Sequence, residues 1–189
     1  MVSTPSLIRQ QMIQQRLALP AEQQVQAAQR LSRFALDNPK IQAAQHVGVY
    51  LAQKNEIDLQ PLIESLWQQH KSLYLPVLHP IKPSHLWFAH YSINTKLVLN
   101  RYRILEPKIS AQDVIAPWEL DVVLTPLTAF DHTGNRIGMG AGYYDRSFEF
   151  TRQCNKPELI GCAYHWQQVP VLQPQPWDVP LNAVVTDQR

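Results

Sequence analysis

The apolar run Val122-Val-Leu-Thr-Pro-Leu127 leads into Asp131-His-Thr-Gly-Asn-Arg-Ile-Gly-Met-Gly-Ala-Gly-Tyr-Tyr-Asp-Arg146, which holds four of the chain's six glycines. Glycine loses more backbone entropy on folding than other residues, so a glycine cluster indicates a sharp bend or a close approach to a ligand. A helix-compatible segment begins at Tyr143. A strand, a glycine loop and a helix start in this order hold phosphates, because amide N–H groups converge and the helix end adds partial positive charge.

The residues that flank the glycines carry charge of both signs. Arg136 and Arg146 bracket the loop with fixed cations, and Asp145 supplies a hard oxygen ligand suited to Mg²⁺. The loop lacks the Gly-Lys-Ser/Thr ending of a Walker loop, and Tyr143 stands where the dinucleotide fingerprint needs its third glycine. A plain tight turn would explain the glycines but not these charged and aromatic neighbours. We therefore interpret the segment as a nucleotide-phosphate site.

Strand-like and helix-like patterns alternate along the whole chain. Short apolar stretches that are typical of buried strands occupy residues 47–51, 73–77, 86–89, 122–124, 159–163 and 183–185. Helical patterns occupy residues 5–19, 21–36, 59–70 and 147–153. This alternation predicts an α/β fold with a mainly parallel sheet, in which ligands bind beyond the carboxyl ends of the strands. The loops after Leu51 and Leu124 would both open at that edge.

Composition limits the classes of protein to which the chain can belong. Its 189 residues, 45% hydrophobic and 17% charged, suit one domain over residues 1–189 and neither a disordered nor a membrane-spanning chain. A net charge of +2 without a basic run gives no sign of nucleic-acid binding. The N-terminus lacks the pattern of a secretion signal. We therefore expect Cys154 and Cys162 to be free thiols in a reducing cytoplasm.

The segment from Asn135 to Asp145 resembles the signature of the 5-formyltetrahydrofolate cyclo-ligase family, whose members are also called 5,10-methenyltetrahydrofolate synthetases. Weaker blocks in the same order extend the resemblance over nearly the whole chain: residues 7–9, 15–17, 50–57, 74–77, 105–107, 125–131 and 177–185. The resemblance implies a three-layer α/β/α fold of the Rossmann-like type, similar to that of sugar-phosphate isomerases and CoA-transferases.

The reaction of this family explains why such residues are needed. It joins the formyl group on one folate nitrogen to the neighbouring secondary amine and expels the formyl oxygen, which leaves a methenyl bridge. That oxygen is a poor leaving group, and the resemblance implies that it first attacks the γ-phosphate of ATP. The protein must then hold magnesium–ATP and 5-formyltetrahydrofolate side by side, so its main tasks are positioning and charge neutralisation.

Residue roles follow from matching positions with the family. The resemblance implies that catalysis involves Arg136, Tyr143 and Asp145. It implies that ATP contacts Arg9, Arg136, Ile137, Gly138, Met139, Gly140, Ala141, Gly142, Tyr143 and Tyr144. It implies that folate contacts Leu51, Glu56, Met139, Gly140, Ala141, Gly142 and Tyr143, and that Mg²⁺ is held by Asp145 and Asp178. A carboxylate such as Glu56 can accept the two N–H groups of the pterin edge.

The chain departs from the family pattern at two positions. Pro5 stands four positions before Arg9, where many relatives carry lysine, so the N-terminal ATP contact rests on Arg9, with Arg16 on the same helix face as a second candidate. Ala141 replaces a glycine or lysine that is common in relatives. Without the resemblance, Glu56 would be interpreted as a surface loop residue and Asp178 as a turn residue between prolines.

Two other functions stay open on the sequence alone. One is a different ATP- or phosphate-using enzyme on the same scaffold, and the other is a non-catalytic nucleotide-binding protein. Asp145, Asp178 and Glu56 together argue against a mere binder, which needs neither metal nor pterin contacts. We expect a monomeric cytoplasmic enzyme that uses ATP and Mg²⁺ on 5-formyltetrahydrofolate or its polyglutamylated forms, with no nucleic-acid or membrane partner.

Overall fold

A mainly parallel sheet of seven strands forms the centre of the computed structural model, which describes residues 4–108 and 114–188. The strand order is β11-β10-β7-β1-β2-β3-β6. The first five strands are parallel to one another, and β3 and β6 follow in antiparallel pairing. The strands are β1 (His46–Gly48), β2 (Ser72–Leu78), β3 (Leu86–Tyr91), β6 (Val114–Ile115), β7 (Val122–Pro126), β10 (Glu158–Ala163) and β11 (Ala183–Thr186). This sheet confirms the predicted α/β class.

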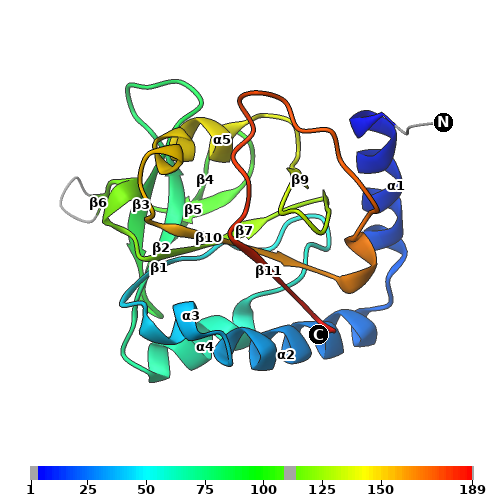
Figure 1. Ribbon diagram of the computed structural model, residues 1–189. Coiled ribbons are helices and arrows are strands. Elements are labelled where there is room, and N and C mark those ends of the chain that lie inside the picture. The colour runs from blue at the N-terminus through cyan, green and yellow to red at the C-terminus, as the bar shows by residue number, and fades with distance from the viewer. Residues whose placement is uncertain (1–3, 109–113, 189) are drawn as a thin grey trace.

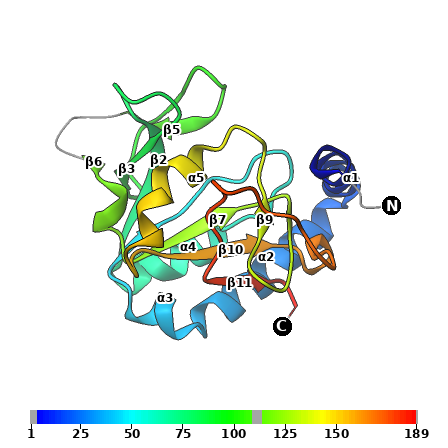
Figure 2. The ribbon, with the colours of Figure 1, turned by 45° about the horizontal axis from the view of Figure 1, so that its top comes forward.

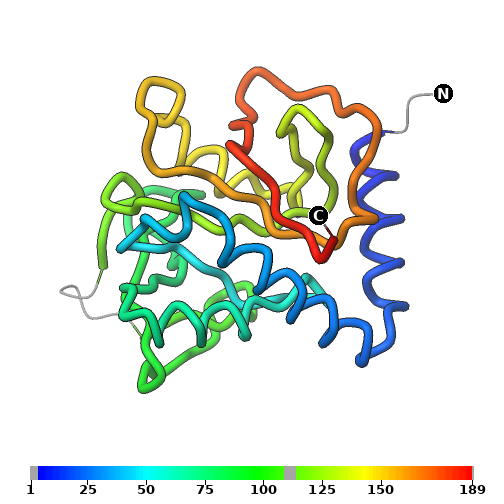
Figure 3. Tube along the Cα trace, turned by 60° about the horizontal axis from the view of Figure 1, so that its bottom comes forward, coloured from blue at the N-terminus to red at the C-terminus, as the bar shows by residue number. Residues whose placement is uncertain are grey.

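Helices cover both faces of the sheet (Figure 1). One face carries α2 (Ala21–Leu36), α3 (Pro39–Ala43) and α4 (Gln60–Gln68), and Figure 3 brings this face forward. The opposite face carries α5 (Tyr143–Phe148) and the 3₁₀ turn Glu149–Arg152. None of the helices among the described residues combines the length and apolar character needed to cross a lipid bilayer.

The first helix, α1 (Pro5–Ala18), belongs to neither of these layers. It stands beside the edge of the sheet where the parallel strands end, and Figure 2 shows it nearly end-on next to β9. Its start matches the prediction, since the Thr4 hydroxyl caps the Leu7 amide and Pro5 opens the first turn. Met12 fixes its inner face by packing on Ala129 and Ile137.

Alternate residues of each parallel strand pack into two separate cores. In β7, Val122 and Leu124 join the core beneath α2 and α4, whereas Val123 joins the core beneath α5. In β10, Ile160 and Leu159 divide in the same way. Because both faces are buried, such strands are continuous apolar runs in the sequence, which is why they could be located there.

Several predicted segments differ in extent from the structure. The strand predicted over residues 47–51 ends at Gly48, since the chain leaves the sheet there to form the loop that carries Glu56. The helix after the glycines is the six-residue α5, and a 3₁₀ turn continues it. The strand directly before the glycines is β9 (Arg136–Ile137), which pairs with β8 (Ala129–Phe130), and not β7. Two-residue strands have no periodicity by which the sequence could indicate them.

One buried carboxylate organises the turn of the β8–β9 hairpin. Asp131 accepts hydrogen bonds from the amides of Thr133, Asn135 and Leu172 and from the Thr133 and Asn135 side chains, at 2.7 to 3.1 Å. Burial raises the pKa of Asp131, but these hydrogen bonds outweigh burial and hold it at about 2. Through Leu172, the carboxylate also ties the hairpin to the segment that follows β10.

We predict that Asp131→Asn lowers the free energy of unfolding by about 2 kcal/mol at pH 7, because an uncharged amide replaces a carboxylate that accepts five hydrogen bonds. The folded pKa lies below the unfolded value of about 3.9, so this contribution is present above pH ~4 and is lost as the pH falls toward 2. Urea unfolding between pH 7 and 3 measures both effects. Asp58→Asn, which changes an exposed carboxylate that caps the Gln60 amide, is the control. Identical pH profiles for the two variants would contradict the role of Asp131.

Candidate active site

The glycine loop, residues 138–142, connects β9 to α5 at the edge of the sheet beside α1. Gly140 and Gly142 have φ angles of 97° and 66°, which lie in the left-handed region that favours glycine. Gly138 serves a different purpose, because a Cβ built on it would meet no atom within 4 Å. Its missing side chain therefore leaves open space beside the loop.

Two arginines of α1 reach this loop from the same helix face. Arg9 donates from Nε to the Gly138 carbonyl at 2.8 Å, and its guanidinium carbon lies 3.6 Å from a Cβ built on Gly140. Arg16, two turns later, places Nη2 4.0 Å from the Met139 sulfur. The helix thus lies over the loop, and Arg9 joins the loop residues with which the sequence analysis grouped it.

The loop after β1 reaches the same place through Arg16. Glu56 is buried, with 9% of its side chain exposed, and its Oε1 lies 3.6 Å from Arg16 Nη1. Its Oε2 accepts the Gln53 amide at 3.0 Å, and the Asn55 side chain donates to the Arg16 carbonyl. Burial raises the pKa of Glu56, against the opposing effects of the Gln53 amide and the Arg16 charge. Glu56 is therefore not the surface residue that its sequence context alone suggests.

A second group of predicted residues meets at Val179. Arg136 pairs with Asp145 at 2.8 Å and also donates to the Val179 carbonyl, while the Val179 amide donates to Asp145. Only 5% of the Arg136 side chain and 22% of the Asp145 side chain are exposed. Asp178, the neighbour of Val179, accepts the Gln175 amide at 2.8 Å. The two acids predicted to hold Mg²⁺ thus belong to segments that contact each other.

This donor set suits Mg²⁺ better than a transition metal. Within residues 4–108 and 114–188, no group of three or more His, Cys, Asp and Glu side chains is placed to hold a metal ion. Mg²⁺ does not need such a group, because proteins bind it through one or two carboxylates, with water and substrate phosphates completing its shell. Asp145 and Asp178 are two carboxylates of this kind, on segments that contact each other.

Tyr143 makes contacts that the sequence analysis missed. The hairpin of β4 (Leu97–Leu99) and β5 (Leu105–Pro107) brings the Tyr102 hydroxyl to 2.8 Å from the Tyr143 hydroxyl. Arg101 donates to the same Tyr143 hydroxyl at 3.4 Å. The hydrogen bond from Tyr102 lowers the pKa of Tyr143, and Arg101 adds to the effect. No local pattern marks the hairpin as part of this site, since it lies about 40 residues away in sequence.

The remaining predicted residues support the two loops. Ile137 is buried beneath the glycine loop, and the Ala141 carbonyl accepts a hydrogen bond from Arg146. The Tyr144 ring stacks on Phe148, and burial raises its pKa. Leu51 is half-buried and packs on the core beneath α2 and α4.

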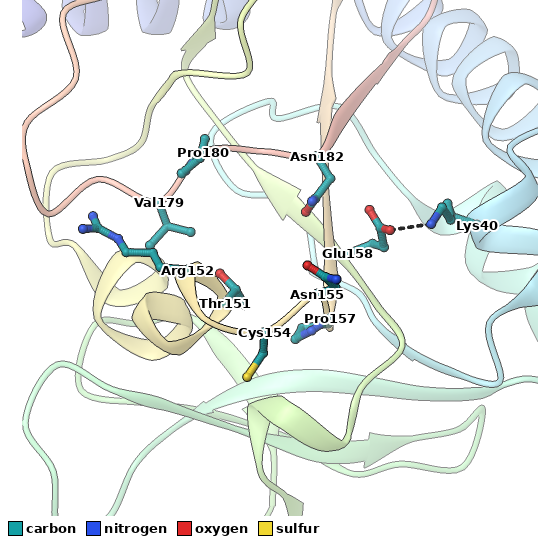
Figure 4. A pocket seen from close by; sticks show the side chains of 10 residues that line it. All are labelled: Lys40, Thr151, Arg152, Cys154, Asn155, Pro157, Glu158, Val179, Pro180 and Asn182. Atoms are coloured by element: carbon teal, nitrogen blue, oxygen red, sulfur yellow. Dashed lines mark hydrogen bonds and ion pairs between the residues drawn. The ribbon is translucent and has the colours of Figure 1, made fainter.

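A cavity of about 320 Å³ lies at the end of the sheet where β10 begins, and Val179 is among the residues that line it (Figure 4). Its charged groups already have partners: Lys40 pairs with Glu158 at 2.6 Å, and Arg152 donates to backbone carbonyls. Cys154 faces this cavity and is a free thiol, as is the buried Cys162. None of the predicted site residues lines it, so we place the candidate site at the glycine loop instead.

Comparisons with known proteins show the family to which the chain belongs. The sequence model of the 5-formyltetrahydrofolate cyclo-ligase family matches residues 2–187. The 5-formyltetrahydrofolate cyclo-ligase of Escherichia coli K12 is 43% identical over 176 residues, which cover 93% of this chain and 96% of that protein. The enzyme of the same name from Haemophilus influenzae is 42% identical over 175 residues, 92% of each chain. The solved structure of Aquifex aeolicus 5,10-methenyltetrahydrofolate synthetase superposes with a TM-score of 0.82 at 26% identity, covering 98% of this chain and 90% of that one. The chain therefore belongs to the 5-formyltetrahydrofolate cyclo-ligase family.

Proposed function

We propose that this protein closes 5-formyltetrahydrofolate to 5,10-methenyltetrahydrofolate and consumes magnesium–ATP in doing so. The observation that carries this proposal is that α1 joins the glycine loop to the Glu56 loop: Arg9 contacts Gly138, and Arg16 contacts both Met139 and Glu56. A phosphate-binding segment and a pterin-binding carboxylate on one edge of the sheet are what a reaction between ATP and a formylfolate needs.

Arg9 and the open side of the glycine loop support the assignment of the triphosphate site. Arg9 donates a hydrogen bond from Nε to the Gly138 carbonyl. The rest of its guanidinium lies against Gly140, where a phosphate would approach. The helix that follows has only six residues, so Arg9 and the loop amides carry more of the anion binding than a helix dipole. Arg16 is oriented toward Glu56, which favours a role for Arg16 in binding folate and not ATP.

Asp145 and Asp178 would hold the magnesium ion, which supplies positive charge to the reacting phosphates when it is bound. Arg136 keeps Asp145 in place and holds the Val179 segment, so its role is first to position the metal-binding acids. Tyr143, held by Tyr102 and Arg101, would line the space between the two substrates and orient the formyl group.

The balance of the reaction assigns the protein two tasks. The formyl oxygen leaves with the transferred phosphoryl group as inorganic phosphate, ADP is released, and the neighbouring amine forms the new bond to the formyl carbon and loses its proton. The protein must bring the oxygen to the γ-phosphate and must exclude water, which would otherwise accept the phosphoryl group. The cover that α1 forms over the glycine loop suits that second task.

A single assay separates this function from the two others that the sequence left open. Purified protein, Mg–ATP and 5-formyltetrahydrofolate are mixed, and methenyl product is followed by its near-ultraviolet absorbance together with ADP release. We expect both signals only when all three components are present. ADP release without folate would indicate a different ATP-using enzyme, and binding of ATP with neither signal would indicate a nucleotide-binding protein.

We predict that Asp145→Asn lowers kcat/KM about 100-fold, because a neutral amide binds Mg²⁺ poorly and the loss corresponds to ~3 kcal/mol of transition-state stabilisation. The variant keeps an oxygen that can accept the Val179 amide, but the buried Arg136 loses its charge partner, so its urea midpoint should fall and activity is compared where both proteins are folded. Raising the Mg²⁺ concentration should recover part of the activity. Glu149→Gln, an exposed acid just after α5, is the control. Wild-type kcat/KM in Asp145→Asn would remove Asp145 from the metal site.

We predict that Glu56→Gln raises the KM for 5-formyltetrahydrofolate at least tenfold and leaves the KM for ATP within about twofold. The glutamine amide can accept only one of the two donors of the pterin edge, the amino group or the ring N–H, and a lost bond to a charged acceptor is worth about 1.5–3 kcal/mol. Steady-state kinetics with each substrate varied in turn measures the difference. Glu64→Gln on the exposed side of α4 is the control. Equal losses for both substrates would contradict the pterin assignment of Glu56.

A further inference from the structure

We propose that Arg16 determines the specificity of the folate site: together with Glu56 it reads the amide edge of the pteridine ring, Glu56 accepting a ring N–H and Arg16 donating to the adjacent ring carbonyl. The inference rests on the proposed function, which gives the site its folate. It adds Arg16 to the folate site and explains why this arginine is buried beside Glu56.

The observation behind the inference is a buried guanidinium with unused donors. Arg16 has no exposed surface, and its Nε and Nη1 have no hydrogen-bond partner among the described residues. Its nearest charge is Glu56 at 3.6 Å, which is within ion-pair range but longer than a hydrogen bond. Buried donors are nearly always paired in folded proteins, and an unpaired charged donor is costly. The site therefore lacks an acceptor in the unliganded chain.

A second unpaired group lies in the same region. The Tyr164 hydroxyl is buried without a hydrogen-bond partner among the described residues, although its ring stacks on Trp166 at 5.4 Å. Burial raises the pKa of Tyr164 to about 12, and the Arg16 charge opposes that shift, so the two side chains interact electrostatically. Tyr164 follows β10 and Arg16 lies on α1, so two elements far apart in the sequence each carry a buried, unpaired polar group.

The arrangement complements one particular ligand edge. A pterin ring presents an amino group, a ring N–H and a carbonyl in a row, which are two donors followed by an acceptor. A carboxylate satisfies the donors, and the carbonyl then needs a donor immediately beside that carboxylate. Arg16 Nη1, 3.6 Å from Glu56 Oε1, supplies a donor at this position. An analogue with a second amino group in place of the carbonyl would instead point donors at a cation.

Met139 covers the pair in the unliganded chain. Its sulfur lies 4.0 Å from Arg16 Nη2 and 3.7 Å from the Thr128 hydroxyl, both of which are donors. A thioether is a weak acceptor on a flexible side chain, and 46% of Met139 is exposed. Met139 therefore stands where a stronger acceptor could lie, and rotation of its side chain would open Arg16 to the ring.

Contacts other than the Arg16 guanidinium also attach α1. The helix packs through Met12 on Ala129 and Ile137, and the Asn55 side chain binds the Arg16 backbone carbonyl. A substitution that keeps the length of the Arg16 side chain therefore tests its donors rather than the docking of the helix.

The experiment compares two ring probes: folic acid, with a 4-oxo group and a neighbouring ring N–H, and aminopterin, with a 4-amino group and no such N–H, and the Arg16 variants isolate the part of the preference that depends on Arg16. Calorimetry on the full chain gives their affinities for the wild type, Arg16→Met and Arg16→Lys. We expect the wild type to prefer folic acid at least tenfold, Arg16→Met to lose that preference through weaker binding of folic acid, and Arg16→Lys to retain part of it. Arg33→Met, on the exposed side of α2, is the control and should keep the wild-type preference.

Three outcomes would overturn the inference: no preference in the wild type, binding of neither probe, or an unchanged preference in Arg16→Met. If Arg16→Met does not fold, Arg16→Lys decides the matter, since an unchanged preference in that variant also overturns the inference. The KM for ATP in the folded variants should stay within twofold, which a general loss of structure would not allow. Wild-type turnover of 5-formyltetrahydrofolate tests the proposed function separately, so each idea can fail alone.

Discussion

The site depends on the buried ion pair between Arg16 and Glu56. Removing two charges from water costs several kcal/mol per ion, and a 3.6 Å contact without a direct hydrogen bond returns only part of that cost. The fold tolerates the arrangement because neighbouring contacts fix its geometry: Met12 packs α1 against the β8–β9 hairpin, and the Gln53 amide holds the Glu56 carboxylate. An incompletely satisfied charge pair beneath a phosphate-type loop is what a site looks like before its ligand supplies the missing partners.

The order of the strands in the sheet brings the Glu56 loop and the glycine loop to the same edge. β1 and β7 are neighbours and run parallel, so the chain segments that follow them leave from the same edge. The loop after β1 delivers Glu56, and the hairpin after β7 delivers the glycine loop. Helix α1 is free to lie across both, because α2, α3, α4 and α5 already cover the two faces. A helix outside the layers thus connects loops that the sheet only brings near each other.

The parts of the fold that the sequence predicted are those governed by local rules. Parallel strands buried on both faces are apolar runs, and α1 begins with a capping threonine and a proline, so their positions could be derived. The two-residue strands β8 and β9 could not, since their pairing depends on the carboxylate of Asp131. The burial of Arg16 and the contact of Tyr102 with Tyr143 arise from segments 40 residues or more apart, and no periodicity encodes such contacts. The glycine loop, Arg136 and Asp145 stood out in the sequence pattern and the other candidate residues came from the family resemblance, whereas their partners required the structure.

The pairing of Arg136 with Asp145 suggests how one carboxylate can serve both the unliganded and the loaded protein. A partly buried carboxylate that carries its charge without a metal needs another positive group beside it. Arg136 supplies the compensating charge and also holds the backbone of Val179, so the residue beside Asp178 stays attached to the start of α5. If Mg²⁺ replaced Arg136 as the charge partner of Asp145, Arg136 would still donate its hydrogen bond to the Val179 carbonyl. Under the proposed metal assignment, the segment that carries Asp178 would keep its place while Asp145 changed partners.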